Sequence, residues 1–351
     1  MAGFVFALFL FLLKWYNYFK FVWKECFIDA MDGENNLLLT CRESEDGIII
    51  LRCETRDAVV RLPETVFGKH VIELGPYAMA RRAPNLPGSC ETFSVCVGAG
   101  CQNGHDASSI RRLTLPSCMR RVGDYAFYDC HSLEYLQAGE SLAEIGSDAF
   151  LNCVNFCILQ TKISADGTSC LRGVLREHHG ELLCVMQFID GEQAHLLFPP
   201  YSEEYEELAA PHIFGYHIEG AGFTYRQCFD GRKVSFSQYD AALERLILTQ
   251  DFDFAVRIGL ERLCWPKDLS PTHRARYESL LSSHANESLR ILLKNKDSEG
   301  LIRMLPLGLF PANCLQTACD IARTDKNTEM LGILLNHLHH TGTCQTKTFD
   351  L

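Results

Sequence analysis

Two consecutive segments of this chain, residues 110–132 and 133–155, repeat one apolar pattern with a period of 23 residues. The matched positions carry the same or similar side chains: Leu113 and Leu136, Val122 and Ile145, Gly123 and Gly146, Ala126 and Ala149, Phe127 and Phe150, Cys130 and Cys153. A period in the twenties with closely spaced leucines is typical of stacked units that bury their apolar faces only against each other. The pattern therefore predicts a solenoid.

Each unit is expected to contain a short strand, a turn and a compact return segment. Leu113 alternates with polar neighbours, as in a strand with one buried face, and Pro116 ends that strand. Gly123 permits either a positive φ or a close backbone approach. Ala126 and Phe127 then predict a short helical turn whose ring fills the space between units.

Less regular copies flank the two clear units. Residues 62–79 carry a divergent first copy, and Phe156 and Leu159 begin a further strand after the second regular unit. In the insertion between the first two units, residues 93–97 are expected to supply a strand. The sequence thus predicts about three units, near the minimum for this architecture, with caps at both ends.

The motif Leu113-Thr114-Leu115-Pro116, followed by Val122-Gly123, Ala126-Phe127 and Cys130, resembles the BspA-type leucine-rich repeat of bacteria and protists. The resemblance covers about residues 58–160. It implies a right-handed stack of repeats that binds protein, often at bacterial surfaces, and it implies no catalytic residues. Two departures are visible, because Gly139 replaces the proline of the second unit and Arg81-Arg82 stand where the first would have its cysteine.

A continuous sheet of repeat strands would present alternate side chains away from the core. The resulting candidates for contact with a protein partner are Arg112, Thr114, Glu134, Tyr135 and Gln137. Tyr135 is expected to be an exposed aromatic residue of the kind that carries interface energy. A cross-strand contact that stiffens the sheet would explain the same residue.

The chain is predicted to have an α+β fold, in which a short leucine-rich repeat solenoid is followed by an α-helical domain. Apolar spacing switches to the helical period near Ser237. The expected divisions are an apolar extension at 1–30, the repeat domain at 31–161, a mixed hairpin and capping region at 162–236, and a helical array at 237–351. The last two helices weakly resemble an ankyrin-type pair.

The middle region contains the features on which an enzyme hypothesis depends. Asp190-Gly191 predicts a hairpin turn, and the glutamates at 203–207 suggest a solvated helix face. The glycines near Tyr225 and Arg226 suit either a ligand or a tight turn. Since the chain lacks a phosphate-binding loop, a zinc-protease motif and a nucleophile elbow, we expect no enzymatic activity, and an enzyme with a site in this region is kept as an alternative.

Composition narrows the possible partners and cofactors. The net charge of −11 argues against nucleic-acid binding. The 17 cysteines fall mainly at apolar positions, which predicts reduced and buried thiols. A cluster of Cys90, Cys96, Cys101 and His105 lacks the usual spacing of a zinc site, so no metal or other cofactor is expected.

The amino-terminal segment leaves three alternatives open. Residues 2–13 are almost wholly apolar, but Lys14 interrupts them before the roughly 20 residues that span a bilayer, and the flanks lack signal-peptide features. Translation could start at Met31, residues 2–23 could anchor the chain with the repeats on the cytoplasmic side, or the chain could be exported. We expect a cytoplasmic scaffold that binds protein, with an exported or anchored surface adhesin as the alternative.

Overall fold

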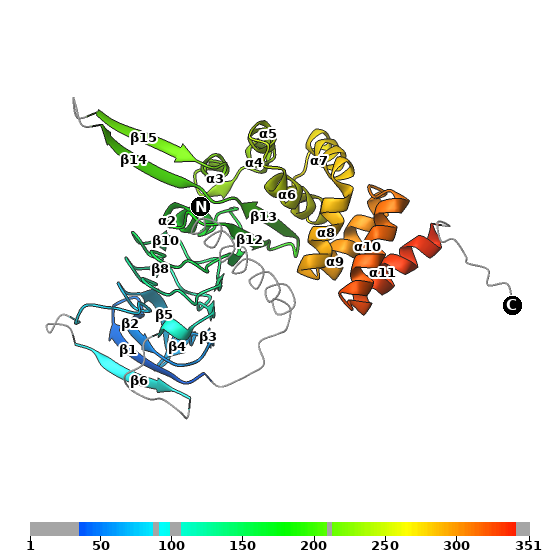
Figure 1. The fold of residues 1–351 in the computed structure, drawn as a ribbon. Coiled ribbons are helices and arrows are strands. Elements are labelled where there is room, and N and C mark those ends of the chain that lie inside the picture. Colours follow the sequence, from blue (N-terminus) through cyan, green and yellow to red (C-terminus); the bar gives the residue numbers. More distant parts are fainter. Residues whose placement is uncertain (1–34, 87–90, 99–106, 209–212, 342–351) are drawn as a thin grey trace, which may run out of the picture. The chain divides into compact units, whose positions relative to one another are not determined.

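The computed structural model describes residues 35–86, 91–98, 107–208 and 213–341, which form two compact units (Figure 1). The first unit ends at Gln250 and contains the strands of the described chain, and the second begins at Asp251 and is helical. The predicted α+β architecture is confirmed. The apolar extension at 1–30, with the possible membrane segment at 2–23, lies outside the described residues.

One sheet of the first unit stacks five parallel strands: β3 (Val59–Arg61), β7 (Arg112–Thr114), β9 (Tyr135–Ala138), β11 (Ile158–Lys162) and β12 (Leu182–Gln187). Leu113 lies opposite Leu136, which is the 23-residue register that the repeat predicts. The antiparallel strand β13 (Gln193–Phe198) closes the sheet after the predicted turn at Asp190-Gly191. The solenoid therefore extends beyond the three units read from the sequence.

A second sheet runs along the other strand of each unit. It stacks β2 (Ile48–Glu54), β5 (Lys69–Leu74), β8 (Arg121–Val122) and β10 (Glu144–Ile145) in parallel. The antiparallel strand β1 (Leu37–Glu43) pairs with β2, and β4 (Thr65–Val66) pairs with β5. Residues Phe93–Val97 form strand β6, as predicted, but β6 pairs with β1 and caps the sheet edge instead of completing a repeat.

The return segments are successive tight turns, so the predicted short helical turn is wrong. The N–H groups of Tyr125 and Phe127 donate to the carbonyls of Ser147 and Ala149 in the next unit. Tyr125 and Asp129 have φ angles of 54° and 60°. A helix would use these N–H groups internally, whereas the turns direct them to the neighbouring unit and add a third hydrogen-bonded ladder.

A column of aromatic rings fills the interior between the ladders. The ring of Phe150 lies 5.2 Å from Phe127 and 4.8 Å from Phe156, centroid to centroid, and all three are at most 2% exposed. The prediction that one ring per unit fills this space is confirmed. Each unit therefore depends on its neighbour for the burial of its largest side chain.

The repeated cysteines and glycines also act between units. The Sγ atoms of Cys130 and Cys153 lie 3.0 and 3.1 Å from the carbonyl oxygens of Met79 and Phe127. A Cβ atom at Gly146 would lie 2.4 Å from a backbone nitrogen, so close approach explains the glycine. Twelve described cysteines carry free thiols, while the edge-strand residue Cys96 is disulfide-bonded.

Helix α2 (Leu171–Glu177) caps the last repeat at strand β10. Arg176 donates from Nη2 to the carbonyl of Ile145 at 2.9 Å, and the Glu177 carboxylate accepts from the N–H of Asp148 at 2.7 Å. These side chains take the positions that the backbone of a further repeat would fill. The cap therefore satisfies the exposed ladder without another unit.

The acidic stretch that was predicted to be helical lies in a strand. Strand β14 (Ser202–Leu208) pairs with β15 (Ile213–Glu219) in an antiparallel hairpin. The first unit continues through α3 (Gly222–Arg226), β16 (Phe229–Asp230), β17 (Lys233–Val234), α4 (Phe236–Ala241) and α5 (Leu243–Leu248). Tyr239 of α4 donates its hydroxyl to the carbonyl of Leu197 at 2.7 Å, which ties this helix to the sheet.

The second unit consists of helices, as the apolar spacing predicts. They are α6 (Phe252–Cys264), α7 (Pro271–Ser283), α8 (Ala285–Asn295), α9 (Ser298–Met304), α10 (Ala312–Thr324) and α11 (Thr328–His340). Ser270 caps the start of α7, because its side chain accepts from the N–H of His273. Within the described chain, no helix has the length and apolarity required to cross a membrane.

Two helix pairs of this unit share one connection. Lys296 and Lys326, 30 positions apart, adopt φ angles of 53° and 55°. Each is followed by a helix cap: Asp297 accepts from the N–H of Gly300, and Asn327 accepts from the N–H of Met330. The pairs α8–α9 and α10–α11 thus repeat the same turn, while their ankyrin-type character stays a prediction.

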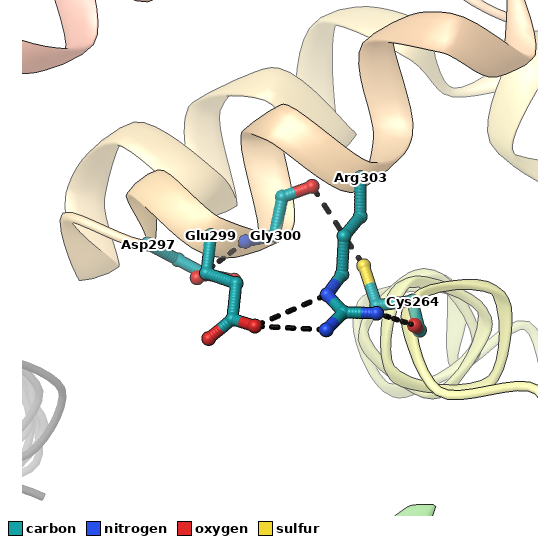
Figure 2. A network of polar contacts seen from close by, with 5 residues as sticks. All are labelled: Cys264, Asp297, Glu299, Gly300 and Arg303. Atoms are coloured by element: carbon teal, nitrogen blue, oxygen red, sulfur yellow. Dashed lines mark hydrogen bonds and ion pairs between the residues drawn. The ribbon is translucent and has the colours of Figure 1, made fainter. Parts of the chain in front are cut away.

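A polar network surrounds the first of these caps (Figure 2). Arg303 donates to the Glu299 carboxylate at 2.9 Å and to the carbonyl of Cys264 at 3.4 Å, and its guanidinium lies 3.9 Å from the centre of the Trp265 ring. Burial raises the pKa of the nearby Asp297 carboxyl to about 7. This cap therefore titrates near neutral pH.

Candidate binding surface of the solenoid

The strand sheet of the solenoid has one apolar and one largely polar face. Leu113, Leu136 and Leu159 occupy equivalent positions on three neighbouring strands and are buried. The alternate positions point the other way and carry the polar side chains. We use the name strand face for the outward residues Arg112, Thr114, Gln137 and Gln160, with Tyr135 between them.

Tyr135 is 6% exposed, so the expectation of an exposed aromatic residue is wrong. The Arg112 guanidinium lies 4.2 Å from the centre of the Tyr135 ring on the next strand. The Tyr135 hydroxyl donates to the side-chain oxygen of Gln160 on the strand beyond. Tyr135 therefore connects three strands, and its ring contacts the Arg112 guanidinium. This is the cross-strand role that the sequence analysis gave as the second explanation for Tyr135.

The remaining candidates divide into paired and unpaired groups. Arg111 donates twice, each at 2.9 Å, to the carboxylate of Glu134, which neutralises that predicted contact residue. Thr114 donates to Gln137 at 3.3 Å, and Gln137 lies in register with Gln160. Among the described residues, no carboxylate forms an ion pair with Arg112. The strand face thus presents an arginine beside polar amides.

A cluster of three partly exposed tyrosines, which the sequence reading missed, lies on the return segments. The rings of Tyr77 and Tyr125 stack with centroids 5.0 Å apart, and Tyr128 meets them edge-on at 6.4 and 6.1 Å. Hydrogen bonding to Asp148 raises the pKa of the Tyr125 hydroxyl. The signal was present in the sequence, since Tyr77 and Tyr125 occupy matching positions before Ala78 and Ala126.

The structure also places the residues of the other predicted sites. Tyr225 and Arg226 are buried, and Arg226 donates to backbone carbonyls that include those of Pro199 and His178. Across the described ranges, no group of three or more histidine, cysteine, aspartate or glutamate side chains has a metal-binding arrangement. Of the suggested metal cluster, Cys90, Cys101 and His105 lie outside the described residues.

The repeat geometry agrees with a comparison against known families. The model of the BspA type leucine-rich repeat region matches residues 102–173 in six copies. This segment is a BspA-type leucine-rich repeat region. It contains all five predicted contact residues and ends within the first turn of the capping helix α2.

Two further comparisons add no argument to this assignment. The crystal structure of the T. pallidum leucine-rich repeat protein is 19% identical over 35% of this chain and 68% of its own, with a TM-score of 0.21. A search of curated proteins gives no match. The assignment of the leucine-rich repeat region therefore rests on its sequence motif and on the 23-residue register of its strands.

Proposed function

We propose that this chain is a non-enzymatic scaffold that binds a partner protein through the strand face of its leucine-rich repeat region. The main observation in support of this proposal is the placement of Arg112. Its guanidinium lies over the Tyr135 ring and has no ion-pair partner among the described residues. An arginine with restricted motion loses little conformational entropy on binding. It is also among the residue types that most often dominate interface energy.

The chemistry of the strand face favours an acidic partner segment. Arg61 lies in register with Thr114, so a second exposed arginine flanks the row that continues through Gln137 and Gln160. Complementary charge accelerates encounter and suppresses wrong partners. The amide side chains supply both donors and acceptors for the partner backbone.

A cytoplasmic location belongs to the same proposal, and an exported or anchored adhesin is its alternative. Free and buried thiols, such as those of Cys130 and Cys153, support a reducing compartment. Counting free thiols in denatured, non-reduced protein from the native host separates the two alternatives. Mainly free thiols support the cytoplasmic proposal, and extensive disulfide formation contradicts it.

The binding proposal is tested by comparing captured partners from the native host. The test variant combines Arg112→Glu with Gln137→Ala, and the control is Arg245→Glu, which reverses an exposed arginine of α5. Because both test residues are partly exposed, the melting temperature should remain close to that of the wild type.

The specific partner should fall at least about tenfold in abundance with the test variant, as quantified by mass spectrometry, and stay unchanged with the control. An identical partner profile from the folded test variant would contradict the strand-face proposal. Tyr135→Ala is unsuitable for this purpose, since it removes a buried ring.

A further inference from the structure

A cavity of about 810 Å³ lies at the capped end of the solenoid, within the first unit. Residues of α2, α3, β10 and the start of β14 line it. Four of its lining residues are arginines, Arg172, Arg176, Arg226 and Arg232, although the chain as a whole has 33 basic and 44 acidic residues. A cleft lined mainly by one sign of charge raises the local concentration of counter-ions, so this cavity favours an anion.

Arg226 is a buried residue of the cavity lining. Its guanidinium donates to the carbonyl oxygens of His178, Gly180, Pro199 and Gly222, at distances from 2.5 to 3.4 Å. The guanidinium also lies 4.9 Å from the centre of the Tyr201 ring. Burial lowers the pKa of Arg226 to about 10, which leaves the group charged at neutral pH. The carbonyls fix this cation without cancelling its net charge.

Arg172 and Arg232 supply donors nearer to solvent. Arg172 donates from Nη1 to the carbonyl of Gly231, and Arg232 donates from Nη2 to the carbonyl of Leu142 at 3.5 Å. Their other N–H groups meet no acceptor among the described residues, and no described carboxylate pairs with either side chain. Both guanidinium groups thus retain donors for a ligand.

Two carboxylates also line the cavity, and each has another partner. Glu144 lies 3.9 Å from Arg121, which is not a lining residue, and Glu203 interacts with the Tyr201 hydroxyl. Arg176 is engaged by Glu177 and by the carbonyl of Ile145. The cavity therefore keeps a positive balance after its internal contacts are counted.

Part of the lining is aromatic. Tyr201 and Phe223 meet edge-on with ring centroids 5.7 Å apart, and His179 lies 4.6 Å from Tyr201. Rings of this kind provide flat apolar surface for a planar ligand group. The cavity volume falls in the range of small-molecule sites, which is roughly 300–1,000 Å³.

We propose that this cavity binds a small phosphate monoester that carries a planar ring, with the phosphate held by Arg172 and Arg232. A phosphate monoester has nearly two negative charges and three acceptor oxygens, which match forked guanidinium donors from separate segments. The ring of the ligand would lie against Tyr201 and Phe223. This site is separate from the strand face, so its test does not depend on the protein partner.

The proposal is tested by calorimetry on the full chain at 150 mM salt. The probes are adenosine monophosphate, inorganic phosphate, adenosine and citrate. The test protein is the double variant Arg172→Gln/Arg232→Gln, and the matched control is Arg245→Gln. Circular dichroism checks that both are folded. We expect the monophosphate to bind more tightly than inorganic phosphate, and adenosine and citrate to bind at least about tenfold more weakly than the monophosphate.

The double variant should weaken monophosphate binding at least about tenfold while the control binds as the wild type does. A folded double variant with unchanged affinity would overturn the site. Equal binding of citrate would overturn its phosphate chemistry, and equal binding of adenosine would overturn the role of the phosphate. Absence of binding by both phosphate probes at millimolar concentration would overturn the proposal as a whole.

Discussion

The guanidinium of Arg112 lies 4.2 Å from the ring centre of Tyr135, and the Tyr135 hydroxyl donates in turn to Gln160. Three successive strands of the solenoid are thus connected by one contact chain. The order of these contacts matters for function, because Tyr135 is buried and Arg112 is the more accessible side chain. The strand face therefore offers charge and hydrogen bonds to a partner, with the aromatic ring as support.

Removal of the Tyr135 hydroxyl should have a small and specific effect. Tyr135→Phe keeps the ring under Arg112 and loses the hydrogen bond to Gln160, so the free energy of unfolding should fall by about 1 kcal/mol. Tyr135→Ala should cost about 3–5 kcal/mol, because it also removes the buried ring. Urea denaturation followed by circular dichroism measures both values, and equal effects would contradict the supporting role of the ring.

The aromatic column should dominate the stability of the repeats. Phe127→Ala removes a ring that stacks on Phe150 and should lower the free energy of unfolding by about 3–5 kcal/mol. Val154→Ala is the control, since this side chain is 74% exposed, and its effect should stay within about 0.5 kcal/mol. Chemical denaturation of the two variants checks the difference, and comparable losses would refute the proposed core.

The Asp297 cap should make the helical unit more stable in mild acid than at alkaline pH. Burial, with Glu261 and Glu299 nearby, raises the pKa of this carboxyl from 3.8 to about 7, while the hydrogen bond from the Gly300 N–H and the Arg303 charge oppose the shift. Between pH 3.8 and about 7, the Asp297 carboxyl is therefore protonated in the folded state and ionised in the unfolded state. The free energy of unfolding should decline as pH rises through this range, on the order of 2–4 kcal/mol in total.

Asp297→Asn is a suitable matched variant, since Asn327 occupies the equivalent cap in the next helix pair. It should retain the hydrogen bond to Gly300 and lose the pH-dependent decline. The fluorescence of Trp265 reports unfolding of this unit once Trp15 and Trp23 are replaced by phenylalanine. If the free energy of unfolding of wild type and variant changes with pH by the same slope between pH 5 and 8, Asp297 does not titrate in this range.

His178 should have the opposite effect on the solenoid unit. Burial, together with the nearby Arg226 charge, lowers the pKa of its imidazole from 6.5 to about 4. Its Nε2 atom meets no hydrogen-bond partner among the described residues. Since the unfolded state takes up a proton first, the free energy of unfolding should decrease by roughly 3 kcal/mol as pH falls from 6.5 to 4.

Titration by nuclear magnetic resonance measures the pKa of the His178 imidazole directly. The His178→Gln variant assigns the signal. The expected midpoint is near pH 4. A midpoint near 6.5 would show that the side chain is accessible to water in the folded protein.

Much of the solenoid could be predicted because its contacts repeat along the chain. The matched pairs Phe127 with Phe150 and Cys130 with Cys153 fixed both the register and the interior positions. The return segments were assigned wrongly, since short local patterns do not distinguish a helical turn from turns that hydrogen-bond to a neighbouring unit. Strand β14 was missed for a related reason, because its acidic residues are uncommon in strands.

The candidate sites depend on contacts that periodicity does not encode. Alternation predicts that Tyr135 points away from the core, but its burial depends on Arg112 and the adjoining strands. The arginine cavity is formed by residues as distant as Glu144 and Arg232, which only the folded cap brings together. No local motif in the sequence could reveal that combination.

Site-specific photo-crosslinking tests the strand-face proposal most directly. A benzoylphenylalanine at position 137 places the reactive group on the strand face, and the same residue at position 154 places it on an exposed turn that does not belong to this surface. In cells of the native host, the position 137 probe should crosslink a specific protein, and the Arg112→Glu substitution should abolish the product. Crosslinking of that protein only from position 154, or a position 137 product that persists with Arg112→Glu, would contradict binding through the strand face.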